Sequence, residues 1–185
     1  SEVAAGVETL LADTGVTPGL ATVIVGENIA SQTYVRAKRK ACAEVGIQSF
    51  GHELPAASTQ TEVEMLVREL NADRNVHGIL VQLPLTDGLD EEAVLAAISI
   101  QKDVDGFHPI NIGKLGMKGR DPLFVPCTPD GCMRLLEESG AQFSGANAVV
   151  LGRSNIVGLP AAMLLLKRDV TLTVCHSRTK DLPIA

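Results

Sequence analysis

Along the first hundred positions, the pattern of apolar residues alternates between helical spacing and the short apolar runs typical of buried strands. Residues 3–11 place apolar side chains at helical spacing, and residues 20–25 (LATVIV) form a continuous run that predicts a strand covered on both faces. Further strands are expected at residues 47–54 and 78–83, and further helices at residues 32–45, 60–70 and 90–98. Strands that alternate with helices in this way need crossover connections, so the pattern predicts an α/β domain with a mainly parallel, helix-covered sheet.

Two of these helices carry recognisable end signals. Ser31 can cap the start of the helix at residues 32–45, and Gly46 can end it in the left-handed conformation that glycine adopts freely. Thr59 and Glu62 have the spacing of a capping box, in which each side chain bonds the backbone N–H of the other residue. We therefore expect well-defined helix ends in this part of the chain.

The regular pattern stops between Lys102 and Pro126, where glycines and prolines are frequent. This stretch predicts a long loop or linker, and loops of that length inside compact proteins are more often functional than idle. After it, Thr128 and Pro129 form a cap and first-turn pair, which predicts a helix that runs to about Ser139.

A second α/β unit follows this helix. It has a strand pattern at residues 146–152, a helix after Gly158 and another strand pattern at residues 170–176. We therefore expect two domains, with residues 1–125 in the first and residues 126–185 in the second.

Charge and composition narrow the class of partner. The chain has 185 residues and a net charge of −6, which argues against binding nucleic acid through a basic surface. No apolar run reaches the roughly 20 residues that span a bilayer, and the first residues do not resemble a signal peptide. We therefore expect a soluble protein with no membrane partner.

The four cysteines are scattered and contain no CxxC pair. This usage favours reduced thiols and a cytoplasmic location. Cys127, Cys132, Cys175 and His176 are conceivable zinc ligands, but their spacing fits known zinc sites poorly, and small buried side chains explain the cysteines better. The sequence therefore predicts no metal site.

The first candidate site lies on the helix at residues 32–45. Tyr34 and Lys38 are four residues apart, so they project from the same helix face and can flank one ligand. Because the helix follows the first strand, that face can reach the carboxyl ends of the strands, where open α/β sheets bind ligands. The alternative is a solvated basic face of the kind that Arg36, Arg39 and Lys40 form.

Two further polar residues stand near strand ends or turns. Gln82 ends an otherwise apolar run, so its amide needs hydrogen-bond partners, either in a polar site or as a loop cap ahead of Pro84. Asp105 lies in KDVDG, where an aspartate before glycine is a common turn residue. By itself, Asp105 indicates little.

The second candidate site is the segment LGRSNIVGLP at residues 151–160, between a strand and a helix. Glycines at the strand exit and the helix entry let backbone N–H groups approach a phosphate, and the helix dipole favours an anion. The spacing is not the GxGxxG of dinucleotide fingerprints, although the strand and helix context is right. The candidate cofactor-binding residues here are Gly152, Arg153, Ser154, Ile156 and Gly158.

The end of the next strand indicates which cofactor would bind. NAD sites usually place a carboxylate there for the ribose 2′-hydroxyl, but this chain has Ser177 and Arg178. Together with Arg153, they could surround a 2′-phosphate, which favours NADP over NAD. The alternative is that these arginines are solvent-exposed residues of a surface turn and bind no ligand.

Six ordered segments are similar to the bifunctional methylenetetrahydrofolate dehydrogenase/methenyltetrahydrofolate cyclohydrolase family. They are PGLATVIVG, SQTYVRAKRKACAEVGI, HGILVQLPL, KDVDGFHPIN, PCTPDG and GRSNIVGLP. The resemblance implies an N-terminal parallel αβα folate-binding domain, followed by the beginning of a Rossmann-type NADP-binding domain.

The family resemblance also implies roles for the candidate residues. Lys38 would be catalytic, Tyr34 would stack on the pterin side of the folate, Gln82 would partner the lysine, and Asp105 would anchor the pterin. The implied enzyme oxidises 5,10-methylenetetrahydrofolate with NADP and hydrolyses the methenyl product to 10-formyltetrahydrofolate. In the family this product serves purine biosynthesis, and a homodimer is the expected assembly.

The chain departs from the family at its ends. Family members begin with a short extra segment and continue well past Ala185, so we expect this chain to be a fragment. One alternative function is a truncated, non-catalytic folate- or nucleotide-binding module. Another is a dehydrogenase of the shikimate or amino-acid type, which explains the TYVRAK and VQLPL segments poorly.

Overall fold

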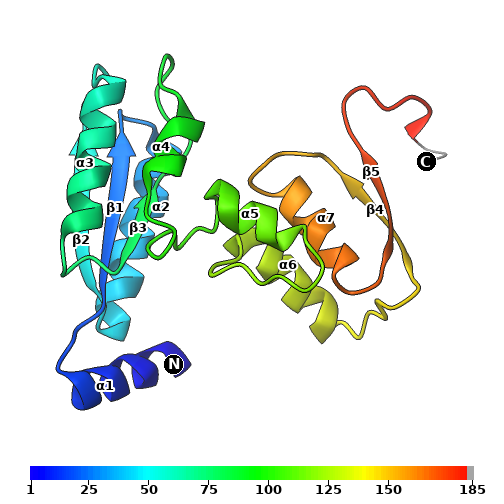
Figure 1. The fold of residues 1–185 in the computed structure, drawn as a ribbon, viewed down its shortest axis with the longest axis horizontal. Helices are drawn as coiled ribbons and strands as arrows, with labels where there is room; N and C mark the ends of the chain where they lie inside the picture. The colour runs from blue at the N-terminus through cyan, green and yellow to red at the C-terminus, as the bar shows by residue number, and fades with distance from the viewer. Residues whose placement is uncertain (183–185) are drawn as a thin grey trace. The chain divides into compact units, whose positions relative to one another are not determined.

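The computed structural model describes residues 1–182, which form two compact units. The first unit is Ser1–Val104, and the second begins at Asp105. In chain order the first unit contains α1 (Glu2–Thr14), β1 (Gly19–Val25), α2 (Ile29–Val45), β2 (Gln48–Leu54), α3 (Gln60–Ala72), β3 (Gly78–Val81) and α4 (Glu91–Ala97) (Figure 1).

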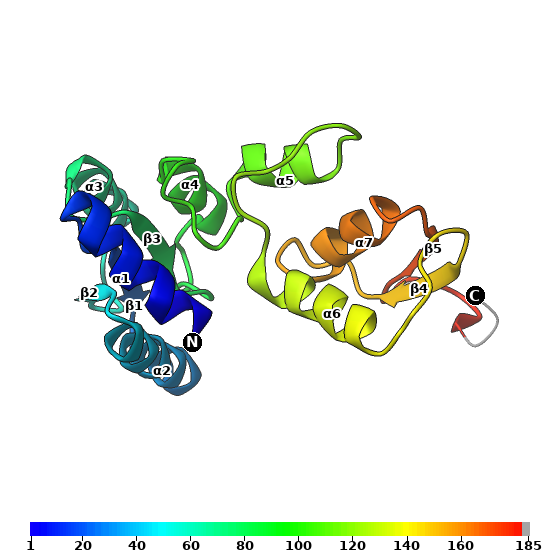
Figure 2. The same ribbon diagram turned by 90° about the horizontal axis from the view of Figure 1, so that it is seen from below.

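The strands of the first unit form one parallel sheet in the order β2-β1-β3. Helix α2 covers one face of this sheet, and α3 and α4 cover the other (Figure 2). Between them lies an apolar core in which Val23, Val67 and Ile79 are fully buried. The predicted α/β fold with a parallel, helix-covered sheet is thus confirmed.

Helix α2 begins earlier than predicted. Its N-cap is Asn28, not Ser31, because the Asn28 side-chain oxygen accepts a hydrogen bond from the Ser31 N–H at 3.0 Å. Ser31 is instead buried in the first turn. The end of the helix is as predicted, since Gly46 has φ 81° and its N–H bonds the Cys42 carbonyl.

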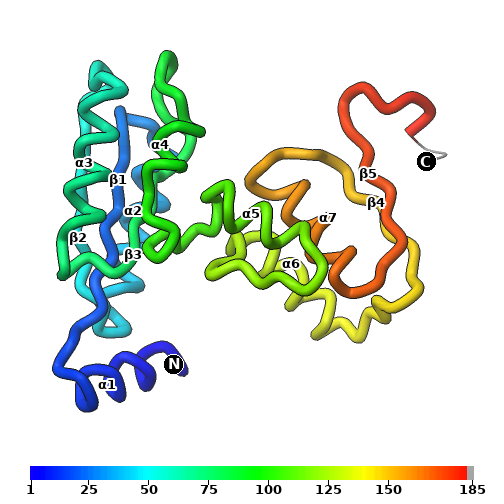
Figure 3. Tube along the Cα trace, viewed as in Figure 1, coloured from blue at the N-terminus to red at the C-terminus, as the bar shows by residue number. Residues whose placement is uncertain are grey.

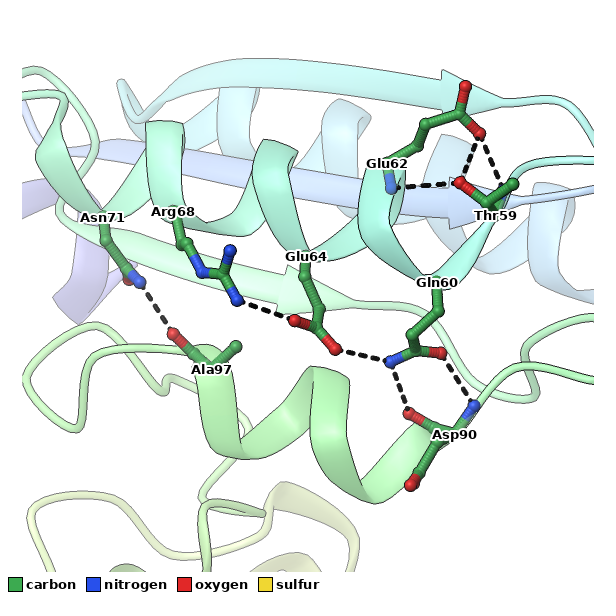
Figure 4. Close-up of polar contacts among 8 residues, drawn as sticks. All are labelled: Thr59, Gln60, Glu62, Glu64, Arg68, Asn71, Asp90 and Ala97. Atoms are coloured by element: carbon green, nitrogen blue, oxygen red, sulfur yellow. Dashed lines mark hydrogen bonds and ion pairs between the residues drawn. The ribbon is translucent and has the colours of Figure 1, made fainter.

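Helix α3 begins with the predicted capping box. Thr59 Oγ1 accepts from the Glu62 N–H at 3.3 Å, and Glu62 Oε2 accepts from the Thr59 N–H at 2.7 Å (Figure 4). These hydrogen bonds, led by the one from the Thr59 backbone, lower the pKa of the Glu62 carboxyl.

Polar side chains along α3 bind α4 (Figure 4). The Gln60 side chain accepts from the Asp90 N–H at 2.9 Å and donates to Glu64 at 2.9 Å. At the other end, Asn71 Nδ2 donates to the Ala97 carbonyl at 2.8 Å. These contacts hold α4 on α3, outside the apolar core that both helices cover.

Strand β3 is shorter than predicted. It ends at Val81, although the apolar run continues to residue 83. Pro84, three residues after Val81, has no backbone N–H and cannot continue the ladder. Gln82 is therefore the first residue after the strand, and its backbone N–H still donates to the Val23 carbonyl at 2.8 Å.

The second unit contains α5 (Pro109–Leu115), α6 (Cys127–Glu138), β4 (Asn147–Leu151), α7 (Gly158–Leu166) and β5 (Thr171–Cys175). Strands β4 and β5 are parallel neighbours, and Leu115, Met133 and Leu164 belong to the buried cluster of this unit. This arrangement confirms the predicted strand–helix–strand crossover.

The segment between residues 102 and 126 is not the continuous loop that the sequence predicted. It contains α5 (Figure 3). This helix has Pro109 in its first turn and is capped by the His108 side chain. Inside this helix Leu115 is buried, and Asn111 accepts from the Leu123 N–H at 2.9 Å. The frequent glycines of the segment weaken its helical sequence pattern, so the short helix was not predicted. The buried side chains of α5 stabilise this helix.

The start of α6 also differs from the prediction. The helix begins at Cys127 after Pro126, so Thr128 lies inside the first turn and does not cap it. No side-chain hydrogen bond caps α6, whose residues the structure describes throughout. The N-cap position therefore falls two residues before the one that residue preference suggested.

The cysteines are only partly the small buried side chains that we expected. Cys42 and Cys175 are buried, and burial raises the pKa of the Cys42 thiol. Cys127 and Cys132 are exposed on α6 instead. All four cysteines are free of disulfides.

Residues 105–125 belong to the second compact unit, whereas the sequence assigned them to the first domain. The predicted domain boundary near residue 125 was drawn from the sequence pattern, whereas the two compact units are defined by contacts within the chain. The boundary near residue 125 therefore stays a prediction. No helix within residues 1–182 is both long enough and apolar enough to cross a lipid bilayer.

Candidate active site

The first candidate site is built on α2. Residues Ser31, Val35 and Cys42 of this helix are buried, and the face beside them carries Tyr34 and Lys38. Lys38 is half-buried, whereas the Tyr34 side chain is 64% exposed. The amine is thus sheltered by the protein, while the ring one turn earlier remains accessible.

Lys38 meets Gln82 across the carboxyl edge of the sheet. Lys38 Nζ donates to Gln82 Oε1 at 3.1 Å, and Gln82 Nε2 donates to the Leu83 carbonyl at 2.9 Å. An ammonium or amine donates, so it needs the oxygen of the amide, and the Leu83 carbonyl needs the nitrogen. The Gln82 side chain therefore both bonds the loop backbone after β3 and accepts the hydrogen bond from Lys38.

The carboxyl ends of β1 and β3 also border a cavity of about 460 Å³. Its lining includes Glu27 and Asn28 after β1, and Thr86 and Asp87 after β3. The Thr86 hydroxyl oxygen is buried and makes no hydrogen bond to residues 1–182. A polar cavity at this edge is where open α/β sheets hold ligands.

The segment KDVDG is divided between the two units. Asp103 is buried in the first unit and forms a β-bridge with Ile79. Asp105 opens the second unit, where a Cβ atom at Gly106 would meet the backbone of residues 124–126. The structure thus brings Lys38 and Gln82 together in the first unit and places Asp105 in the second.

Lys102 of the same segment closes the end of α3. Its Nζ donates to the carbonyls of Leu70, Asn71 and Asp73 at 3.1, 2.8 and 2.8 Å. A cation at a helix C-terminus satisfies carbonyls that lack partners within the helix. Burial lowers the pKa of Lys102, and the charge of Asp73 opposes this shift.

The second candidate site is the turn from β4 into α7. Gly152 has φ 116°, and its N–H bonds the Cys175 carbonyl at 2.7 Å, which joins the turn to β5. A Cβ atom at Gly158 would overlap the Gly152 carbonyl, so both positions require glycine. Ser154 Oγ accepts from the N–H groups of Val157 and Gly158, each at 3.2 Å, and closes the turn.

The cationic candidates lie at one edge of the second sheet. Leu151 and Cys175 are paired in the parallel register, and Arg153 and Ser177 each follow two residues later. Arg153, Ser177 and Arg178 are exposed, as is Ile156 at 39%. The ends of the two neighbouring strands are therefore followed by two exposed arginines and a serine, residue types that can bind an anionic dinucleotide.

Comparison with known proteins assigns the chain to a family. The model described as tetrahydrofolate dehydrogenase/cyclohydrolase, catalytic domain, matches residues 1–105. The model described as tetrahydrofolate dehydrogenase/cyclohydrolase, NAD(P)-binding domain, matches residues 126–185. The chain belongs to the tetrahydrofolate dehydrogenase/cyclohydrolase family.

Relatives and solved structures agree with this assignment. Bifunctional protein FolD 2 of Arabidopsis thaliana is 60% identical over 181 residues, which cover 98% of this chain and 60% of that protein. The methylenetetrahydrofolate dehydrogenase-cyclohydrolase of Trypanosoma brucei, solved with NADP cofactor and inhibitor, is 45% identical with a TM-score of 0.94. That alignment covers 99% of this chain and 62% of that one. The chain thus spans about 60% of the length of these relatives.

The family domains divide the candidate residues as the sequence did. Tyr34, Lys38, Gln82 and Asp105 lie within the match to the catalytic domain, although the structure assigns Asp105 to the second unit. The cofactor candidates, residues 152–178, lie within the match to the NAD(P)-binding domain. Their individual roles stay predictions.

The conceivable zinc ligands do not form a cluster. Within residues 1–182, no three His, Cys, Asp or Glu side chains gather closely enough to hold a metal ion. Cys127 and Cys132 lie on α6, while Cys175 ends β5.

Proposed function

We propose that this protein catalyses the NADP-dependent oxidation of 5,10-methylenetetrahydrofolate and the hydrolysis of the 5,10-methenyl product to 10-formyltetrahydrofolate. The observation that carries the proposal is the 3.1 Å hydrogen bond from Lys38 to Gln82, in a chain of the tetrahydrofolate dehydrogenase/cyclohydrolase family. The two residues are 44 positions apart and meet only because β3 ends beside α2.

Lys38 is suited to the hydrolytic step. Water must be activated when it attacks the methenyl carbon, and protons must then move to the departing nitrogen, so a positioned amine can carry them. Gln82 holds Lys38 Nζ by one hydrogen bond to its uncharged amide oxygen and leaves the other hydrogen-bond positions of Nζ for water or substrate. A neutral partner also orients the amine without trapping its proton in an ion pair.

Tyr34 and Asp105 are proposed to bind the pterin. The exposed ring of Tyr34 can stack on a flat heterocycle, which adds apolar contact and a preferred ring geometry. The carboxylate of Asp105 can accept hydrogen bonds from the amino and ring N–H groups of the pterin. The stacking contact with Tyr34 would hold the one-carbon bridge near Lys38, one helical turn away.

We propose NADP as the cofactor of the second unit. NADP supplies the acceptor for the hydride that leaves the methylene carbon. Arg153, Ser177 and Arg178 would hold its 2′-phosphate, because guanidinium groups bind phosphate by paired, charge-assisted hydrogen bonds. Gly152, Ser154, Ile156 and Gly158 would form the turn against its pyrophosphate.

The catalytic proposal is tested with Lys38→Ala in the full-length protein. We expect cyclohydrolase turnover to fall by roughly 100-fold or more, as for loss of a general acid–base group. Lys40→Ala is the matched control, because Lys40 lies on the same helix and forms an exposed pair with Glu44 at 3.8 Å. Normal turnover in folded Lys38→Ala protein would refute the proposed role.

The cofactor proposal is tested with Arg153→Ala combined with Arg178→Ala. We expect NADP affinity to fall by roughly tenfold or more for each lost charge-assisted contact, with little change for NAD. Arg134→Ala on α6 is a control for general loss of positive charge. Equal weakening for both cofactors would contradict binding of the 2′-phosphate.

We also propose a cytoplasmic homodimer whose product supplies purine biosynthesis. The four free cysteines support a reducing compartment, and the family resemblance supports the assembly and the use of the product. Sedimentation of the full-length protein at micromolar concentration tests the assembly, and a monomer there would contradict it.

A further inference from the structure

A narrow stripe of small side chains fixes α2 to the sheet. Only Ser31, Val35 and Cys42 of this 17-residue helix are buried, with one turn between the first two and two turns between the last two. Side chains this small interlock weakly with the strands beneath, so apolar packing alone restrains the rotation of α2 about its axis poorly. Polar contacts beside the stripe add to this restraint.

Two neighbouring residues provide such contacts on opposite flanks. Lys38 reaches Gln82, just after β3, and Arg39 Nη2 reaches Glu53 Oε1 on β2 at 3.1 Å. Because β1 lies between β2 and β3, the two partners stand on either side of the strand under the helix. Successive helical residues project about 100° apart, which lets one helix bind both flanks at once.

The contact of Arg39 is more than an ion pair. A Cβ atom at Gly51 of β2 would overlap the Arg39 guanidinium, so this group lies directly on the strand backbone. The Arg39 side chain is 34% exposed, and its Nε is buried without a hydrogen bond to residues 1–182. Glu53 is 69% exposed, so the ion pair alone would hold the helix only weakly.

We infer that Arg39, seated on Gly51, is a positioning residue that sets the rotation of α2 and thereby the reach of the Lys38 amine. This inference rests on the proposed role of Lys38. A roll of about 10° moves a group roughly 6 Å from the helix axis by about 1 Å. Displacements of that size at a catalytic group can cost roughly 100-fold in rate.

The test compares Arg39→Met with Lys40→Met in the full-length protein. Arg39→Met keeps the apolar stem and removes the guanidinium, and we expect the cyclohydrolase kcat to fall by roughly tenfold while KM changes less than about threefold. Lys40→Met loses a cation from the next position of the same helix and should leave kcat unchanged. Titration of active sites with a folate analogue corrects kcat for any unfolded protein.

Two further variants separate positioning from loss of charge or loss of fold. Gly51→Ala keeps Arg39 but displaces its guanidinium, so it should lower kcat in the same way. Arg39→Lys keeps the charge near Glu53 and should restore part of the kcat that Arg39→Met loses. A kcat for Arg39→Met and Gly51→Ala that equals the Lys40→Met value, per active site, would overturn the inference.

The same assay with Lys38→Ala distinguishes the two levels of the proposal. Full activity of Lys38→Ala overturns the proposed function and the inference that rests on it. An inactive Lys38→Ala protein beside a fully active Arg39→Met protein overturns only the positioning role of Arg39.

Discussion

The two units use the same strand–helix–strand connection but cover their sheets differently. In the first unit all four residues of β3, and six of the seven in β1, are buried. In the second unit exposure alternates along β4 and β5, so that Val149 and Leu151 are 49% and 72% exposed. Helices cover both faces of the sheet in the first unit. In the second unit, residues 105–182 cover only one face of the sheet.

The difference does not follow from the strand sequences. After its first residue, the β4 sequence NAVVL is a continuous apolar run like the buried GILV of β3, yet Val149 and Leu151 point outward. A short apolar run therefore predicts a strand, but not how many of its faces are covered. Coverage depends on where the crossover helices lie, which distant parts of the chain decide.

The largest expected effect comes from truncating equivalent aliphatic side chains in the two sheets. Ile79→Ala in β3 should lower the free energy of unfolding by about 3 kcal/mol, because the side chain is fully buried and leaves a cavity. Leu151→Ala in β4 should change it by less than about 0.5 kcal/mol. Urea unfolding followed by circular dichroism measures both, and equal costs would break the comparison.

A smaller effect is expected from the polar contacts outside the first core. Asn71 bonds the Ala97 carbonyl and the Ser99 N–H, each at 2.8 Å. Asn71→Ala should destabilise the first unit by about 2 kcal/mol, since two half-buried partners lose their hydrogen bonds. Asn147→Ala, at an exposed position of β4, is the matched control in the second unit. A comparable loss there would show that both units depend equally on such contacts.

Local sequence patterns predicted the elements better than their ends. The capping box of Thr59 and Glu62 and the final Gly46 of α2 depend on neighbouring residues alone, and both are confirmed. Asn28 and Ser31 can each cap a helix, and the choice between them depends on which residues of the first turn the sheet buries. Helix α5 was missed because its glycine weakens the helical pattern, whereas tertiary burial of Leu115 stabilises it.

The candidate site shows the same limit. The four-residue spacing of Tyr34 and Lys38 predicts a shared helix face, but no local pattern predicts the contact of Lys38 with Gln82. That pairing came from the family resemblance. The contact of Arg39 with Gly51 was missed altogether, and its only signal was a glycine inside a strand, which often marks a close approach.

Helix caps provide the smallest test of the difference between the units. Side chains cap all four helices of the first unit, through Ser1, Asn28, Thr59 and Asp90. In the second unit neither α6 nor α7 has a side-chain cap among the described residues. Thr59→Ala should therefore lower the free energy of unfolding by about 1 kcal/mol, while Thr128→Ala at the start of α6 should change it by only a few tenths, roughly.

The capping box also makes the first unit sensitive to acid. Hydrogen bonds from Thr59 hold the pKa of Glu62 below its usual value of 4.5, so the folded protein binds the proton less readily than the unfolded chain. The stabilisation is present above pH 4.5 and is lost as the pH falls through the folded pKa. Glu62→Gln keeps an acceptor without titrating, so its stability relative to the parent should rise below pH 4.5. If the difference in stability between Glu62→Gln and the parent stayed the same across this pH range, the pKa shift of Glu62 would be contradicted. For the preceding comparison of caps, equal costs of Thr128→Ala and Thr59→Ala would show that Thr128 does cap α6.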